Sequence, residues 1–152
     1  MRLVNFLTRR WTVSPTVQFR AAVETRDHAA ITTLLAEDVR VFSPVTFLPF
    51  EGIRAVSALF AVLLRTFEDF RYVGAFSGSL TEDNDGEAHI LVFRARVGDK
   101  QIHGIDQLQF DQSGMISKRT VMVRPLSAAT ALNNAVMAGL QAGGARSAQE
   151  AG

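Results

Sequence analysis

FRYVGAFSGS, at residues 70–79, opens the part of the sequence that decides the fold. Apolar and polar residues alternate here with a period of two, and they do so again in three further runs: EAHILVFRARV at 87–97, KQIHGIDQLQF at 100–110 and MISKRTVMV at 115–123. The runs are separated by short segments rich in Gly, Asn and Asp, at 84–86, 98–99 and 111–114. Such residues tolerate the backbone angles of tight hairpins. The pattern therefore predicts four strands in an antiparallel meander.

Two short helices are expected ahead of the meander. Ser14 followed by Pro15 is a typical helix start, because the serine side chain accepts an unpaired N–H and proline at the first helical position loses no hydrogen bond. Asp27 can cap a second helix, in which apolar residues up to Leu34 and Leu35 recur at helical spacing.

A strand and a long helix are expected between these helices and the meander. VRVFSPV, at 39–45, is β-branched and aromatic and contains Pro44, which predicts a short strand at a sheet edge or rim. IRAVSALFAVLLRTF, at 53–67, is apolar almost all round, which predicts a long helix buried on most of its surface. Helices first and a meander afterwards indicate an α+β fold, with the long helix across the concave face of the sheet.

The length of 152 residues fits one domain with a core of its own. We expect an N-terminal extension at 1–13, the domain at 14–126, and a C-terminal part at 127–152. In that last part, Ser127 caps a helix to about Leu140 and a small, polar tail follows.

Composition narrows the classes of function. A net charge of +1 provides no field to attract nucleic acid, and the longest apolar run is too short to span a membrane. The chain has no cysteine, and its three histidines show no close metal-ligand spacing, so we expect neither a metal nor another cofactor. The N-terminal apolar run is too short for a secretory signal, which predicts a cytoplasmic protein.

Several of these segments together resemble the nuclear transport factor 2-like superfamily, and within it the SnoaL-like proteins. The resemblance rests on four stretches in this order: LLAEDVRVFSPV, FEG before the long helix, FEDF, and HGIDQLQFDQSGMI. It implies a cone-shaped fold whose curved sheet and helices enclose a mostly apolar pocket for a small hydrophobic molecule. It also implies a homodimer formed through the outer face of the sheet.

The resemblance leaves the chemistry open. Ketosteroid isomerase is similar to the first half of the chain, and the similarity puts its proton-shuttling carboxylate at Ser43 and its oxyanion-stabilising tyrosine at Phe19, where neither residue can act in that way. Its neutral carboxylic acid corresponds to Asp106. The residues of limonene epoxide hydrolase fall on Asp106, Gly104 and Val121, so that set is incomplete too. SnoaL-like cyclases use an acid/base Asp at the position of Asp106, which makes them the least contradicted catalytic relatives.

Alternation in the strands selects the candidate catalytic residues. Asp106 shares a face with Ile102 and Leu108, so it is expected inside the cone, either as an acid/base or as a partner of buried polar groups. Arg119 falls on the same face of the next strand and is expected to form an ion pair with Asp106, to bind a ligand anion, or to lie solvated at the sheet rim. Ser43 is expected at the mouth of the pocket.

Two histidines have different expected places. His89 alternates with inward residues, which predicts either an acid/base or a hydrogen-bonded histidine at the hairpin. His103 falls on the polar outer face, where an interface role is favoured. The expected pocket wall consists of Phe19, Phe47, Phe50, Phe60, Tyr72, Phe93, Leu108 and Val121.

Three hypotheses follow for the function. The first is a cofactor-independent isomerase, cyclase or hydrolase that acts through Asp106. The second is a binding protein with the same pocket and no turnover. The third is a structural dimer whose cavity is filled by its own side chains.

Overall fold

A computed structural model gives the fold of the chain and describes residues 13–82 and 86–150. Most of the predicted N-terminal extension, the first two residues of the predicted 84–86 turn and the last two residues of the tail lie outside the described residues. The elements are α1 (Pro15–Glu24), α2 (His28–Thr33), β1 (Leu35–Phe42), β2 (Phe50–Glu51), α3 (Ile53–Thr66), β3 (Glu68–Leu80), β4 (Gly86–Val97), β5 (Lys100–Phe110), β6 (Ile116–Arg124) and α4 (Leu126–Glu150).

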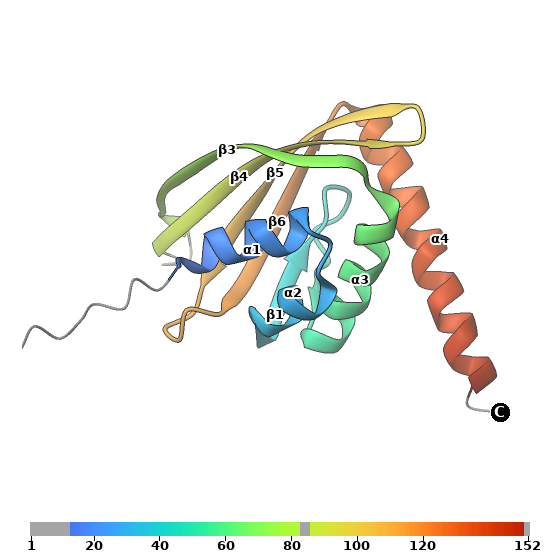
Figure 1. Ribbon diagram of the computed structural model, residues 1–152, viewed down its shortest axis with the longest axis horizontal. Coiled ribbons are helices and arrows are strands. Elements are labelled where there is room, and N and C mark those ends of the chain that lie inside the picture. Colours follow the sequence, from blue (N-terminus) through green and yellow to red (C-terminus); the bar gives the residue numbers. More distant parts are fainter. Residues whose placement is uncertain (1–12, 83–85, 151–152) are drawn as a thin grey trace, which may run out of the picture.

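The helices and the sheet form the expected α+β arrangement. Figure 1 shows a curved sheet with α1, α2 and α3 on its concave side and α4 along one end. The strand order is β2-β1-β6-β5-β4-β3, and the pairs β3–β4, β4–β5 and β5–β6 are antiparallel. The predicted meander is therefore confirmed.

The strand before the meander differs from its prediction. It begins at Leu35 rather than residue 39, it ends at Phe42, and it pairs in parallel with β6 at the centre of the sheet, while the two-residue β2 takes the edge. Leu35 is therefore a strand residue and not part of the second helix. The Ile116 N–H donates to the Leu34 carbonyl at 2.8 Å, and this long-range bond ends the helix earlier than the local apolar spacing indicates.

Both predicted caps of the first two helices are present. The Val17 N–H donates to Ser14 Oγ at 3.3 Å, and the Ala30 N–H donates to Asp27 Oδ1 at 3.0 Å. The long helix α3 departs from the prediction that it is buried on most of its surface. It buries one face only, through Val56, Leu59, Phe60, Val62 and Leu63.

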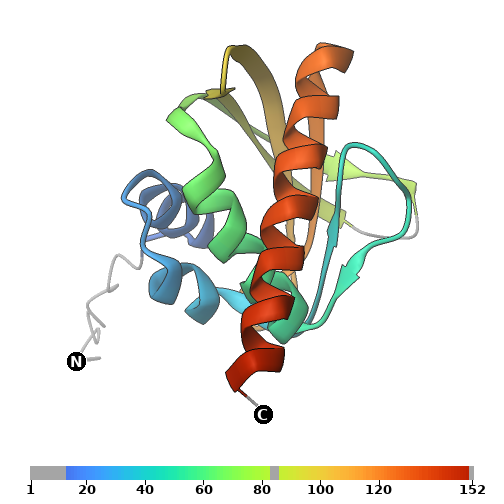
Figure 2. The same cartoon turned by 90° about the vertical axis from the view of Figure 1, so that its right-hand side faces the viewer.

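The C-terminal helix α4 is longer than predicted. It begins at Leu126 and runs to Glu150, so residues 141–150 continue the helix instead of forming a polar tail. Alanine, glutamine, arginine and glutamate in this segment are good helix formers, and they outweigh its two glycines. Figure 2 shows α4 running alongside α3. Gly139 permits this approach, because a Cβ at this position would lie 2.5 Å from Val62 Cγ1.

Aromatic residues fill much of the space between the sheet and the helices. Phe19 of α1 and Phe60 of α3 meet edge to face at 6.0 Å between ring centroids. Phe93 of β4 stacks on Phe70 at 5.0 Å, and its ring occupies the space over Gly104, where a Cβ would lie 2.3 Å from Phe93 Cζ. A glycine at this point of β5 therefore lets the sheet carry a large ring inside its curve.

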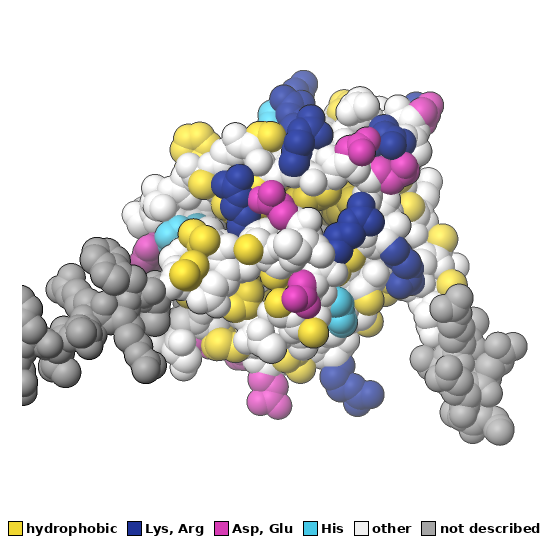
Figure 3. Space-filling model, viewed as in Figure 1, with side chains coloured by type: hydrophobic (Ala, Val, Ile, Leu, Met, Phe, Trp, Pro, Cys, Tyr) yellow, Lys and Arg dark blue, Asp and Glu magenta, His cyan; other side chains and the backbone are white. Residues whose placement is uncertain are grey.

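The surface carries charges of both signs. Figure 3 shows Lys and Arg side chains interspersed with Asp and Glu over the face that it presents. Within the described ranges, no helix is long and apolar enough to cross a membrane.

Candidate functional site

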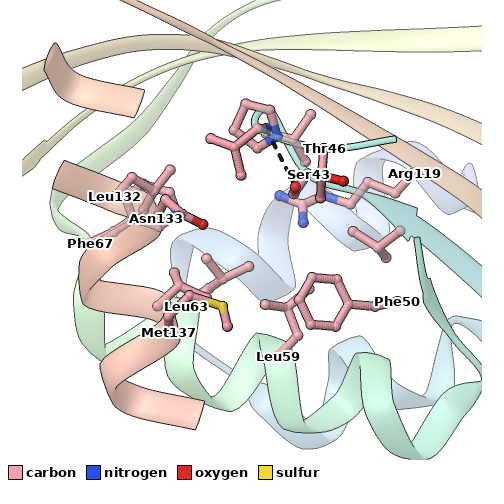
Figure 4. Close-up of a pocket in the computed structure, with 15 residues that line it drawn as sticks. Ser43, Thr46, Phe50, Leu59, Leu63, Phe67, Arg119, Leu132, Asn133 and Met137 are labelled. Carbon is pink, nitrogen blue, oxygen red and sulfur yellow. Dashed lines mark hydrogen bonds between the residues drawn. The ribbon is translucent and has the colours of Figure 1, made fainter. Parts of the chain in front are cut away.

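A cavity of about 100 Å³ lies between the inner face of the sheet, α3 and α4. Its wall is mostly apolar and comes from five parts of the chain, as Figure 4 shows. The lining residues that matter most here are Ser43, Phe50, Leu63, Arg119, Val121 and Asn133. Of the described residues that line the cavity, Arg119 alone carries a formal charge.

The polar centre of the site is a buried ion pair between Arg119 and Asp106. On the antiparallel strands β5 and β6, Asp106 lies opposite Val121, so Arg119 is its diagonal neighbour on the same face. Arg119 Nη2 lies 2.6 Å from Asp106 Oδ1, and Nε donates to the same oxygen at 3.0 Å. Asp106 is fully buried and Arg119 is 5% exposed. Of the places expected for Arg119, the structure shows the ion pair with Asp106 and not a solvated position at the sheet rim.

Tyr72 forms a hydrogen bond with the second oxygen of the Asp106 carboxylate. Its hydroxyl donates to Asp106 Oδ2 at 2.7 Å, so both carboxylate oxygens accept hydrogen bonds. Burial of the ring, and after it the negative charge of Asp106, raises the pKa of Tyr72 well above its ordinary value. Tyr72 therefore stays a neutral donor to the Asp106 carboxyl group.

The ion pair with Asp106 uses Nε and Nη2 of Arg119 and leaves its Nη1 group over. Its Nη1 is buried and has no hydrogen-bond partner among the described residues. The guanidinium carbon lies 4.9 Å from the centroid of the Phe60 ring, which gives the cation an aromatic face on one side. Figure 4 shows the guanidinium pointing toward Ser43 and into the cavity. One side chain thus pairs with Asp106, lines the cavity and keeps a buried Nη1 group without an acceptor among the described residues.

Ser43 follows the end of β1 and lines the same cavity. The Val45 N–H donates to Ser43 Oγ at 3.4 Å, as the dashed line in Figure 4 shows. Because this bond uses a lone pair of the hydroxyl, the Ser43 O–H is still able to donate. Ser43 therefore stands beside Arg119 as a second polar group of the wall.

The predicted pocket wall divides into lining and core residues. Phe50 and Val121 line the cavity. The remaining buried members form the core behind the cavity wall; they are Phe19, Phe60, Tyr72, Phe93 and Leu108. Asp106 also lies behind the wall rather than in it. It touches the cavity only through Arg119.

Two predicted site residues lie elsewhere. Phe47 is 95% exposed and is absent from this cavity, because the loop after β1 turns it outward. His89 lies near the start of β4 and does not line the cavity. Its ring nitrogens are 3.2 Å from Ser77 Oγ and 2.9 Å from Glu87 Oε1. It is a hydrogen-bonded histidine near the hairpin, which is one of the two roles that its position in the sequence allows.

The sequence reasoning missed the contribution of α4. Leu132, Asn133, Val136 and Met137 line the cavity from this helix. Leu132 and Val136 are four residues apart, which is a typical signal of a buried helix face. The signal indicates burial only and does not tell which surface the helix covers. Over the described residues, no group of three His, Cys, Asp or Glu side chains is placed to hold a metal ion.

Comparisons with known proteins agree with this architecture. Residues 16–119 match the model of the SnoaL-like domain. The structure is similar to that of a steroid delta-isomerase from Pseudomonas aeruginosa, with 31% identity and a TM-score of 0.77 over 86% of this chain and 92% of the other. It is also similar to an uncharacterized protein with a cystatin-like fold from Silicibacter pomeroyi, with 27% identity and a TM-score of 0.73 over 82% and 83% of the two chains.

A more distant likeness shows the fold alone. A nuclear transport factor 2-like protein of unknown function from Mesorhizobium loti is 17% identical, with a TM-score of 0.60 over 73% of this chain and 88% of the other. A comparison with curated proteins found no significant match. The domain model spans most of the chain and establishes that the chain belongs to the SnoaL-like family, with a fold of the nuclear transport factor 2-like kind.

Proposed function

We propose that this protein binds a small, mostly apolar molecule in the cavity between the sheet, α3 and α4, with Arg119 as its polar anchor. The observation that carries the proposal is the buried Nη1 of Arg119, which has no partner among the described residues and belongs to a side chain of the cavity wall. An apolar cavity with a few convergent polar groups is the usual form of a small-molecule site. A buried N–H without an acceptor costs free energy that a ligand oxygen would recover.

The size of the cavity favours a compact ligand. At about 100 Å³ it is smaller than the roughly 300–1,000 Å³ of pockets that take drug-sized molecules. A single ring with a short polar substituent suits this space better than a fused four-ring skeleton. The exposed side chains of Val45 and Met137 also line the cavity, so the entrance lies between the loop after β1 and α4.

Binding without acid/base catalysis by Asp106 is the reading that the geometry supports best. A general base must come within hydrogen-bond reach of the proton that it removes. Asp106 is fully buried, does not line the cavity, and accepts hydrogen bonds on both oxygens from Tyr72 and Arg119. Its carboxylate is therefore committed to holding Arg119.

An isomerase is the second candidate, because the relative from Pseudomonas aeruginosa carries the name steroid delta-isomerase at 31% identity. That reaction moves a proton between carbons and needs a base at the cavity wall. The described lining residues include no carboxylate or histidine. Incubation with a β,γ-unsaturated ketone, followed by ultraviolet absorbance of the conjugated product, tests this candidate directly. Catalysed conversion would contradict the proposal of binding alone.

Binding is tested by filling the cavity. Val136 lines the cavity from α4, so Val136→Phe should occupy the space of the ligand. Val17→Phe, on the exposed side of α1, is the matched control because it adds the same ring far from the cavity. Calorimetric titration with acetophenone, a single-ring ketone, should show binding to the natural chain and the control, and loss of binding in Val136→Phe. Equal binding by all three proteins would place the ligand elsewhere and refute the proposal.

A further inference from the structure

We propose that the ligand's polar group is an uncharged hydrogen-bond acceptor, such as a carbonyl oxygen, and that Asp106 is the residue that excludes carboxylates. This inference rests on the proposed function and specifies the class of ligand. It follows from three features of the site: the charge of the buried pair, the geometry of Arg119, and the apolar wall around them.

The buried pair is neutral as a unit. The positive charge of Arg119 is matched by Asp106, whose Oδ1 lies 2.6 Å from Nη2. Tyr72 adds a neutral hydroxyl to the other carboxylate oxygen. No other charged side chain lines the cavity among its described residues. A ligand therefore meets a site whose formal charge is already balanced.

A carboxylate ligand would unbalance this charge. Its attraction to Arg119 would be opposed by repulsion from Asp106 on the same guanidinium, and the net negative charge would lie in apolar surroundings. Transfer of an uncompensated carboxylate from water into such surroundings is strongly unfavourable. From the sequence, Arg119 is a candidate for binding an anion. In the structure, Asp106 cancels most of the attraction between Arg119 and a carboxylate ligand.

A neutral acceptor meets no such penalty. The free N–H groups on Arg119 Nη1 belong to a charged guanidinium, so a hydrogen bond from them to a carbonyl oxygen is charge-assisted. The carbonyl adds no net charge and satisfies a buried donor. The Ser43 hydroxyl on the same wall can supply a second donor to that oxygen. The apolar remainder of the ligand then fits against side chains such as Leu63.

Three isosteric probes separate these contributions. Acetophenone carries a carbonyl and a methyl group, benzoate replaces the methyl group by a charged oxygen, and α-methylstyrene replaces the carbonyl oxygen by carbon. For the natural chain we expect acetophenone to bind at least about tenfold more tightly than either of the other two. Binding of benzoate as tight as that of acetophenone would overturn this inference and leave the proposed cavity intact. Failure of all three probes to bind would contradict the proposed function itself.

Two variants test the role assigned to each partner. Asp106→Asn preserves the shape of the side chain and removes its charge, so Arg119 becomes an uncompensated cation and the preference should reverse in favour of benzoate. Arg119→Met removes the donor, and acetophenone should then bind no better than α-methylstyrene. A change in stability alone would leave these affinity ratios unchanged. An unchanged ratio of acetophenone to benzoate in Asp106→Asn would therefore overturn the inference.

Asp106→Asn is expected to be less stable, since it leaves a buried charge unpaired. The test is still possible with a less stable variant, because a bound anion would restore the charge balance at Arg119. Benzoate should raise the thermal midpoint of Asp106→Asn, and acetophenone should not raise it to the same extent. Should the variant not fold at all, the three affinities of the natural chain decide the matter by themselves.

Discussion

Replacing Tyr72 by phenylalanine removes one oxygen atom from the centre of the buried network and leaves the ring in place. The Tyr72 hydroxyl donates to Asp106 Oδ2 at 2.7 Å, and it is the donor that this oxygen has among the described residues. A hydrogen bond to a charged group contributes about 1.5–3 kcal/mol, and the acceptor left behind is fully buried. We expect Tyr72→Phe to lower the free energy of unfolding by about 2 kcal/mol. For a chain of this length the thermal midpoint should fall by about 4–8 °C.

Chemical denaturation of four proteins isolates the interaction between Tyr72 and Asp106. They are the natural chain, Tyr72→Phe, Asp106→Asn and the double variant. Because the hydroxyl acts through the charged carboxylate, removing it should cost much less once Asp106 is an asparagine, with a coupling energy of about 1–2 kcal/mol. Additive effects of the two substitutions would show that the hydroxyl does not stabilise the carboxylate, and the description of the network would be wrong.

The same network predicts a pH dependence. Burial, followed by the charge of Asp106, raises the pKa of Tyr72 above the ordinary value of 10.0. Below pH 10.0 the hydroxyl is protonated in both the folded and the unfolded chain, so it adds no pH dependence. Above that pH the unfolded chain loses the proton first, and stability falls as the pH rises. Tyr72→Phe should lack this component of the alkaline loss.

An optical titration of tyrosine measures the Tyr72 hydroxyl alone, because the sequence contains a single tyrosine. The folded chain should show no tyrosinate absorbance as the pH passes 10.0, and the absorbance should appear together with unfolding. Tyrosinate that forms near pH 10.0 in a chain that circular dichroism shows to be folded would refute the burial and the hydrogen bond assigned to Tyr72.

Other predictions concern packing, titration and assembly. Gly139→Ala should lower the free energy of unfolding by about 1–3 kcal/mol, because its Cβ would lie 2.5 Å from Val62 Cγ1; Val62→Ala in the same chain should recover much of the loss in chemical denaturation. Burial and the neighbouring arginines lower the pKa of His103, so stability should fall as the pH drops below about 6.5, and His103→Gln should show a smaller fall in the same titration. The outer sheet face exposes Phe76 and Met122, and we expect it to pair two chains. Light scattering should then give twice the 16.6 kDa of the chain, and Met122→Lys should reduce this mass.

The meander was predictable because its signals are local. A period of two, interrupted by turn residues, is read within one hairpin at a time. The parallel pairing of β1 with β6 joins Val41 to Arg119, far apart in the sequence, and no local pattern contains that information. The early end of α2 has the same cause, since the partner of the Leu34 carbonyl is the N–H of Ile116. Pairings of this kind are set by the whole sheet.

The candidate site was predictable to a similar extent. Alternation puts Asp106 and Arg119 on one face, and strand adjacency brings them together. The position of Tyr72 on the inner face was predictable, but its bond to Asp106 was not, because β4 lies between their two strands and the residues are therefore not neighbours on adjacent strands. Which member of the pair faces the cavity depends on side-chain length and on the cover that α4 provides. A short aspartate stays behind the wall, whereas a long arginine reaches the cavity.

The buried pair itself calls for a functional explanation. Removing two charges from water costs about as much as their attraction returns, so well-packed apolar residues in their place are often as stable or more stable. Arg119 and Asp106 therefore add little that a leucine and a methionine could not add to the core. What apolar residues cannot supply is the group of polarised N–H bonds on Nη1 beside an apolar cavity. Asp106 makes that cation tolerable inside the fold, and under our proposal it thereby also fixes the charge of the ligand that the cavity accepts.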